Sequence, residues 1–260
     1  MTGWTRKSRG PAWKTPVTGK AVLRALIALW WGLMALPAAA EQCRLALVLA
    51  LDVSSSVDAT EDTLQRQGLV AALTAPEVRA AFFATDDPVA LAVYEWSGRY
   101  NQEMVLDWTV VRGPADLLMA AETVAASQRS YNDFPTAMGY ALGYGAGVLA
   151  RGPVCLQQTL DMAGGGQNNE GFGPQAAYRE FGFDAVTVNG LVVNAADYEA
   201  EVGLIAFYKA EVLHGPGAFM EVAQGFDDYE RAMRRKLVRE LSPPVFGALP
   251  RPVFQGGGPG

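Results

Sequence analysis

Apolar runs of strand length alternate with segments of helical periodicity along most of the chain. The first run, at 43–51, is continuously apolar, as expected of a parallel strand that is covered on both faces. Further strands are predicted at 88–96, 104–111, 154–163, 185–193 and within 215–223, and helices at 61–74, 76–83, 114–128, 135–149, 174–181, 197–212 and 226–241. Only a few polar residues join the second and third strands, which predicts an antiparallel pair. The alternation as a whole predicts a doubly wound, mostly parallel α/β sheet.

The two ends of the chain differ in composition from the middle. Residues 1–40 carry six basic residues and no acidic one, then a short apolar run and the small residues Ala38, Ala39 and Ala40. This order is typical of a signal peptide, and the run is shorter than the ~20 residues that span a bilayer. We predict a signal peptide at 1–40, a domain at 41–241 and a disordered, Pro- and Gly-rich tail at 242–260. An uncleaved anchor is the less favoured alternative, and after cleavage we expect no membrane span.

Loss of the leader would change the charge balance. It would leave 15 basic against 27 acidic residues, a net charge of −12. Such a domain is a poor nucleic-acid binder and suits divalent cations or basic partners, although acidity also serves solubility alone. The chain has two cysteines, Cys43 and Cys155. In an oxidising compartment they indicate one disulfide, and two buried thiols are the alternative.

A carboxylate and three serines follow the first strand directly. Residues 52–56 read Asp-Val-Ser-Ser-Ser, and ligand sites in doubly wound sheets lie beyond the carboxyl ends of the strands. Alternate side chains of an extended loop point the same way, so Asp52, Ser54 and Ser56 can converge. Their oxygens are hard ligands of low total charge, which suit Mg²⁺ once other loops complete its coordination shell.

These residues resemble the D-x-S-x-S motif of the von Willebrand factor A domain, whose metal-ion-dependent adhesion site lies at this strand end. The chain also looks like a bacterial secreted A-domain family of unknown function in the segments VYEWSG (93–98), TAMGYAL (136–142), QNNEG (167–171), VNGLVV (188–193), GPGAFM (215–220) and RRKLVREL (234–241). The resemblance implies a six-stranded sheet of order 3-2-1-4-5-6 with one antiparallel edge strand, and a periplasmic or secreted bacterial protein.

The resemblance also implies further metal ligands, and the chain departs from the pattern there. Thr136 matches the threonine of the second loop. Where such proteins typically carry Ser-Gly-Asp-Gly, this chain has Ala163 for the serine and Gly165 for the aspartate. With one nearby carboxylate left, we expect Mg²⁺ to bind weakly or not at all, because ligand charge largely sets affinity for hard cations. The glycine run could form an anion-binding nest, but we favour a tight loop.

Other aspartates could replace the missing ligand. Asp133, three residues before Thr136, is the favoured candidate. We interpret Asp161 as a buried carboxylate held by hydrogen bonds and Asp58 as a helix N-cap.

The implied strand order also places the cysteines. Cys43 lies nine residues before Asp52, and Cys155 lies ten before Gly165, at the matching end of the neighbouring strand. Strands ~4.8 Å apart bring two cysteines at equal depth within bridging range. We therefore predict a Cys43–Cys155 disulfide.

These residues favour an exported, non-catalytic protein-binding module, whose unknown partner offers an acidic side chain to the metal. A metal-independent scaffold is the alternative. A hydrolase that uses a serine of 54–56 is less favoured, because the single histidine, His214, is interpreted as a loop residue and no catalytic motif is present.

Two further groups of side chains receive a structural interpretation. Trp96, Tyr100 and Trp108 are expected to pack in the core at a sheet edge. The cluster Arg234, Arg235, Lys236 and Arg239 lies in the later turns of the last helix, where the dipole favours cations, and we expect a solvated face.

Overall fold

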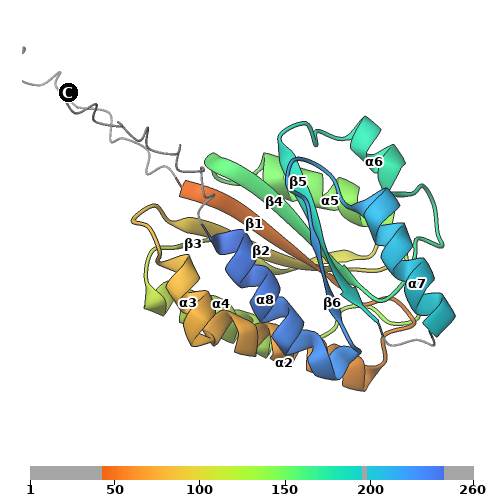
Figure 1. Cartoon of the computed structure of the whole chain (residues 1–260), viewed down its shortest axis with the longest axis horizontal. Helices are drawn as coiled ribbons and strands as arrows, with labels where there is room; N and C mark the ends of the chain where they lie inside the picture. The colour runs from red at the N-terminus through yellow and green to blue at the C-terminus, as the bar shows by residue number, and fades with distance from the viewer. Residues whose placement is uncertain (1–42, 195–197, 243–260) are drawn as a thin grey trace, which may run out of the picture. The chain divides into compact units, whose positions relative to one another are not determined.

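The structure is a computed structural model that describes residues 43–194 and 198–242. The predicted signal peptide and nearly all of the predicted tail lie outside the described residues. The described sheet has the predicted strand order, β3-β2-β1-β4-β5-β6 (Figure 1). Its strands are β1 (Cys43–Asp52), β2 (Val89–Trp96), β3 (Gln102–Val111), β4 (Cys155–Gly164), β5 (Val186–Val193) and β6 (Met220–Ala223). Within this sheet β2 and β3 pair antiparallel and the other neighbours pair parallel, as predicted.

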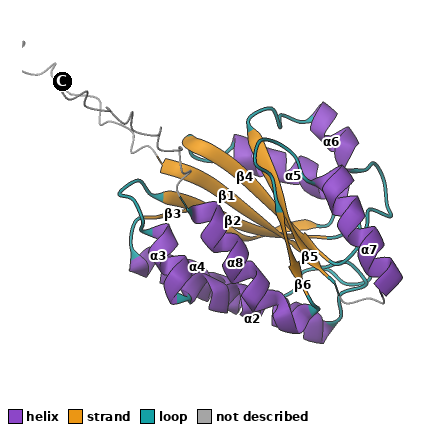
Figure 2. Cartoon of the chain, viewed as in Figure 1, coloured by secondary structure: helices purple, strands orange, loops and turns teal. Residues whose placement is uncertain are grey.

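Helices cover both faces of the sheet (Figure 2). One face carries α2 (Ala59–Thr74), α3 (Pro76–Phe82), α4 (Pro114–Ala126) and α8 (Tyr229–Leu241). The other carries α5 (Met138–Ala150), α6 (Pro174–Glu180) and α7 (Tyr198–Phe207), which continues into a π-helical turn at Tyr208–Val212. The predicted helices are therefore confirmed, although two begin about three residues later than predicted, at Met138 and, after a 3₁₀ turn at Phe226–Asp228, at Tyr229.

The continuous apolar run of β1 is buried on both sides. Leu47, Leu49 and Leu51 belong to the core under α2, α4 and α8, whereas Val48 and Ala50 belong to the core under α5 and α7. Removal of such side chains from water contributes about 25 cal/mol per Å² of apolar surface. This two-sided burial explains why the strand lacks the apolar–polar alternation of a half-exposed strand.

A reciprocal cap begins α2 directly after the serines. The Asp58 carboxylate accepts hydrogen bonds from the backbone N–H groups of Thr60 at 2.7 Å and Glu61 at 2.8 Å. The Glu61 carboxylate in turn accepts from the Asp58 N–H at 2.8 Å. The interpretation of Asp58 as an N-cap is confirmed, and its carboxylate is committed to the helix.

The prediction that the basic cluster of the last helix is a solvated face is wrong for Lys236. Its side chain is fully buried, and its Nζ lies 2.5 Å from a carboxylate oxygen of Asp161 and 2.5 Å from one of Glu240. Asn189 donates to the same Glu240 oxygen at 2.6 Å. Asp161 is thus buried, as interpreted, but an ion pair with the Lys236 ammonium holds it in place of the expected hydrogen bonds.

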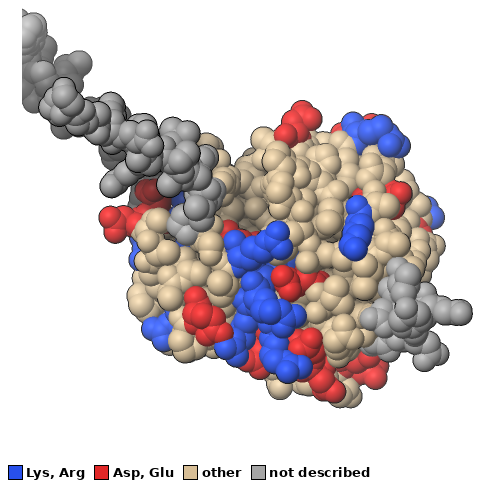
Figure 3. Space-filling view, in the orientation of Figure 1, with Lys and Arg blue, Asp and Glu red and all other residues tan. Residues whose placement is uncertain are grey.

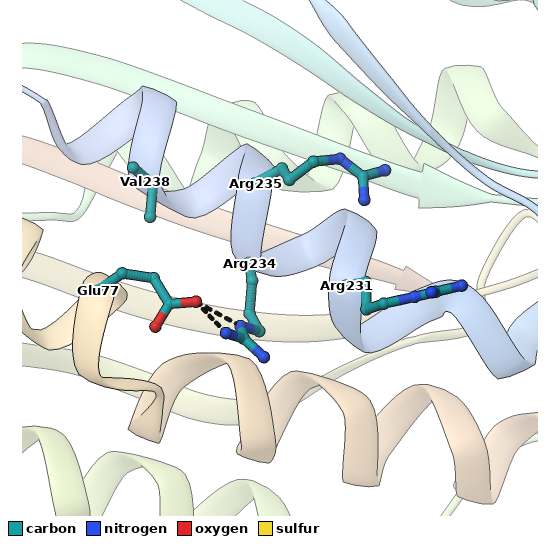
Figure 4. Close-up of a pocket in the computed structure, with 5 residues that line it drawn as sticks. All are labelled: Glu77, Arg231, Arg234, Arg235 and Val238. Atoms are coloured by element: carbon teal, nitrogen blue, oxygen red, sulfur yellow. Dashed lines mark hydrogen bonds and ion pairs between the residues drawn. The ribbon is translucent and has the colours of Figure 1, made fainter.

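The arginines of the cluster do lie at the surface, where they form a band over α8 (Figure 3). Two of them, Arg234 and Arg235, line a groove of about 500 Å³ between α3 and α8 together with Arg231, Glu77 and Val238, and Arg234 turns toward Glu77 in it (Figure 4). Each arginine in the groove pairs with a carboxylate of the chain: Arg231 with Asp228, Arg234 with Glu77 and Glu230, and Arg235 with Glu221. The groove therefore carries little uncompensated charge.

The predicted Cys43–Cys155 disulfide is confirmed. The two residues are register partners at the amino ends of β1 and β4, with their Cα atoms 4.6 Å apart. The bond lies at the opposite edge of the sheet from Asp52.

Replacement of both cysteines by serine should lower stability. The disulfide spans 112 residues of sequence, and loop-closure entropy over such a length predicts a loss of about 2–5 kcal/mol. Guanidinium denaturation of the wild type and the double variant measures the difference. Thiol labelling of the unreduced, denatured wild type should find no reactive thiol, and two reactive thiols would contradict the bond.

Replacement of Asp161 by Asn should flatten the dependence of stability on pH. Burial raises the pKa of Asp161 to about 7, and the neighbouring Glu240 acts in the same direction. Because this pKa exceeds that of the unfolded chain, the folded state binds the extra proton, and stability falls as the pH rises from about 4 to about 7. We expect Asp161→Asn, which mimics the protonated acid, to remove a loss on the order of 4 kcal/mol over that interval.

Urea denaturation at successive pH values measures this effect. Asp133→Asn, at an exposed carboxylate, is the control and should follow the wild-type curve. An Asp161→Asn curve as steep as that of the wild type would show that this carboxylate does not hold the proton.

Candidate functional site

The segment 53–58, here called the serine loop, leaves the sheet at the buried end of β1. The Asp52 side chain is fully buried, and its Oδ1 accepts a hydrogen bond from the Ser54 N–H at 2.8 Å. Gln65 of α2 donates to the Asp52 carbonyl oxygen at 3.0 Å, and the Val57 N–H donates to the Ser54 carbonyl oxygen at 2.9 Å. These bonds make a tight turn, which brings the Oγ atoms of Ser54 and Ser56 to 3.4 Å from each other.

The loop that carries Thr136 meets the serine loop. The Ser55 N–H donates to the carbonyl oxygen of Phe134 at 2.8 Å. Thr136 is buried, and its N–H donates to the Asn169 side chain at 2.8 Å. Asn168 accepts in the same way from the N–H of Met138, at the start of α5. The asparagines of the QNNEG segment therefore position Thr136 and cap the helix that follows it.

The glycines at the end of β4 allow a close approach to these residues. A Cβ atom at Gly164 would lie 2.9 Å from Asp52 Oδ2, and one at Gly166 would lie 3.3 Å from Thr136 Oγ1. Gly165 faces the other way, with its Cβ direction toward the carbonyl oxygen of Val193 at 3.2 Å. The tight-loop interpretation explains this run, because side chains at 164 and 166 would crowd Asp52 and Thr136.

The predicted replacement carboxylate does not join this group. Asp133 is exposed, in a left-handed backbone conformation with φ of 62°. Among the described residues no hydrogen bond or ion pair joins it to the serine loop, and no group of three or more acidic, histidine or cysteine side chains is arranged to hold a metal ion. Asp161 is committed to Lys236. Of Asp52, Asp133 and Asp161, Asp52 is the one whose carboxylate contacts Ser54, through the Ser54 N–H.

Burial dominates the electrostatics of Asp52. It raises the pKa of this carboxyl to about 6, against the opposing effects of the Ser54 hydrogen bonds and the positive charge of Arg129. Its Oδ2 is buried without a hydrogen-bond partner. That oxygen and the three hydroxyls are of the type that Mg²⁺ prefers, but a buried single carboxylate beside a guanidinium is a poor host for two positive charges. The residues present do not fit a tightly held divalent cation.

Sequence reasoning missed Arg129. Its guanidinium donates to the carbonyl oxygens of Val53 at 2.8 Å, Ser54 at 3.1 Å and Val57 at 2.5 Å. No local pattern marks this residue, which lies more than 70 positions from its acceptors in the serine loop.

The expectation of core packing is wrong for Tyr100 and correct for Trp96. Trp96 is fully buried, and Trp108 donates its Nε1–H to the Val148 carbonyl oxygen at 3.0 Å. Tyr100 is 84% exposed in the β2–β3 connection. Phe134 is 39% exposed, and its Cβ lies 3.4 Å from the Cβ position of Gly98 in that connection. Two exposed aromatic rings therefore lie at the edge that carries the serine loop.

His214 lies away from the serines. It bridges to Val188 of β5, stacks on Tyr178 with ring centroids 4.3 Å apart, and places Nε2 3.2 Å from the carbonyl oxygen of Phe183. In the sheet register Val188 lies level with Val48 of β1, four residues or about 13 Å before Asp52. The histidine is packed within the fold, far from the serine hydroxyls.

The strand order and the helices on both faces are those of the von Willebrand factor A fold. The chain belongs to the family described as "Protein of unknown function (DUF1194)", which it matches over residues 42–245. No curated protein matches its sequence.

Solved structures share the fold. Proximal thread matrix protein 1 from the mussel byssus, in a structure with a zinc-occupied MIDAS motif, has a TM-score of 0.51 and 17% identity, over 77% of this chain and 46% of that one. A von Willebrand factor type A structure from Catenulispora acidiphila has a TM-score of 0.51 and 14% identity, over 77% and 43%. The PilB minor pilin from Streptococcus sanguinis has a TM-score of 0.52 and 11% identity, over 77% and 61%.

This chain thus matches less than two thirds of the length of each of these proteins, and such low identities show the fold alone. Across the part of the chain that the structure describes, the helices are too short or too polar to cross a membrane.

Replacement of Gly164 by Ala should destabilise the domain. The new Cβ would meet Asp52 Oδ2 at 2.9 Å and the Tyr208 hydroxyl at 3.0 Å, both buried. Overpacking of this kind costs about 1–3 kcal/mol. The matched control is Gly147→Ala in α5, where a Cβ meets nothing within 4 Å and alanine gains up to about 1 kcal/mol of helix propensity. Urea denaturation compares the two, and equal effects would contradict the close approach.

Proposed function

We propose that this chain is an exported protein-binding module that contacts its partner through the carboxyl edge of the sheet. The observation that carries the proposal is the exposure of Phe134 beside the serine loop and of Tyr100 at the same edge, where Ser56 is also exposed. Aromatic rings next to hydroxyl groups are typical of protein interfaces, because they combine a large apolar area with hydrogen-bonding groups.

The site supports binding better than catalysis. A serine nucleophile needs a general base within hydrogen-bond reach. His214 packs against Tyr178 instead, and Asp52 is fully buried. A hydrolytic role for the serines therefore finds no support in the arrangement of these side chains.

The module would hold Mg²⁺ weakly at most. Asp52, Ser54, Ser56 and Thr136 would supply the ligands, and an acidic side chain of the partner would complete the shell. A metal-independent scaffold is the second candidate, and glycine in place of a second carboxylate at position 165 favours it. Export is supported by the disulfide, which suits an oxidising compartment, and the pilin among the structural neighbours is consistent with it.

Site-specific photo-crosslinking tests the proposed edge. A crosslinker in place of Ser56 should capture a defined partner in cells, and one in place of Val154, which is 88% exposed beside the amino end of β4, should not. The partner is then purified, and its affinity for the full chain is measured. We expect Ser56→Arg to weaken binding at least tenfold and Val154→Arg to leave it unchanged.

Measurement in EDTA and in Mg²⁺ separates the two candidates. Affinity that needs Mg²⁺ would favour the metal-dependent module, and equal affinity the scaffold. Equal loss from both arginine variants would contradict the assignment of this edge.

A further inference from the structure

Arg129 binds both ends of the serine loop. One guanidinium nitrogen, Nη2, donates to the carbonyl oxygens of Val53 and Ser54, and Nη1 donates to that of Val57. The Nε–H donates to the carbonyl oxygen of Tyr131 at 2.6 Å. The planar guanidinium thus joins the loop to the segment that follows α4, through contacts that a single ammonium could not all make.

A buried ion pair holds Arg129 in place. Arg66 of α2 pairs with Glu95, whose side chain at the end of β2 is fully buried. Arg66 also donates to the Ser127 hydroxyl at 2.8 Å, and Glu95 accepts from the Ser130 N–H at 2.6 Å. The residues on either side of Arg129 are therefore anchored, so the guanidinium is positioned before any ligand arrives.

A positive charge already lies at the loop without a divalent cation. Arg129 donates to the carbonyl oxygens of the two residues that follow Asp52, and its charge lowers the pKa of that carboxyl against the larger effect of burial. Gly165 offers no second carboxylate, so a divalent ion would add two positive charges beside a guanidinium and a single, fully buried carboxylate. Both the low ligand charge and the nearby guanidinium oppose its binding.

We propose that Arg129 takes the place of a bound divalent cation at the serine loop. It is a positioning residue that shapes the loop through its carbonyl oxygens and compensates Asp52, so the loop is formed without metal and has low affinity for one. This inference deepens the proposed function and rests on it, since the loop is the one proposed to meet the partner. It favours metal-independent contact.

The metal affinity of the Arg129→Gln variant distinguishes the proposed role from a merely structural one, because a structural role alone would not raise that affinity. Mn²⁺ titration of the full chain, followed by electron paramagnetic resonance, should show affinity at least tenfold higher in Arg129→Gln than in the wild type. The gain should vanish in Arg129→Gln/Asp52→Asn, and Arg129→Lys, which keeps the charge, should not show it. Arg151→Gln removes one charge from an exposed pair with Asp107 and is the matched control, with no gain expected.

Hydrogen exchange of the peptide that contains 53–58 reports the shape of the loop. In the wild type, protection should be equal in EDTA and in 10 mM Mg²⁺. In Arg129→Gln it should fall at least tenfold in EDTA and recover with Mg²⁺. The wild-type comparison stands by itself if the variant fails to fold.

Three results would overturn the inference. They are wild-type protection that rises with Mg²⁺, unchanged protection in Arg129→Gln, or lost protection that no cation restores. No partner is present in either measurement. If these measurements overturn the role of Arg129, the crosslinking experiment still tests the proposed docking edge. If crosslinking contradicts the docking edge, these measurements still decide whether Arg129 shapes the loop.

Discussion

The close approach of β4 to Asp52 is the constraint on which the rest of this edge depends. Only glycine fits at 164, so the carboxylate is enclosed by backbone and loses its contact with water. Enclosure of a carboxylate is costly, and the Ser54 hydrogen bonds and the positive charge of Arg129, which binds the carbonyl oxygens of the same loop, offset part of that cost. The turn that results leaves Ser56 at the surface. Sheet packing, electrostatics and the shape of the exposed edge therefore have one origin.

Most of the fold could be predicted because its signals are local. The apolar run of β1, the prolines that begin α3, α4 and α6, and the Asp58 cap each act within a few residues. The disulfide followed from the strand order that the resemblance implies, because parallel neighbours keep equal depth. The meeting of the serine and threonine loops was also accessible, since both follow from the ends of elements in a known strand order.

The remaining features depend on contacts between distant residues. Lys236 and Asp161 are 75 positions apart, and in sequence this lysine looks like its solvated arginine neighbours. Arg129 likewise acts on carbonyl oxygens of the backbone, which carry no sequence signature at all. Tyr100 was misjudged because an aromatic ring in a strand connection is equally compatible with burial and with exposure. The charge and apolarity of a side chain indicate which environments it can occupy, and the tertiary fold decides which residues it contacts.

The disulfide makes the stability of this domain depend on the redox conditions around it. Cys43 opens the first strand and Cys155 opens the fourth, so the bond encloses β2, β3 and the helices α2 to α5. Without the bond that large loop stays open, and ordering it costs more entropy. Under the proposed export, a chain that is still reduced before translocation would therefore unfold more easily than the oxidised domain. Oxidation afterwards would hold β1 to β4.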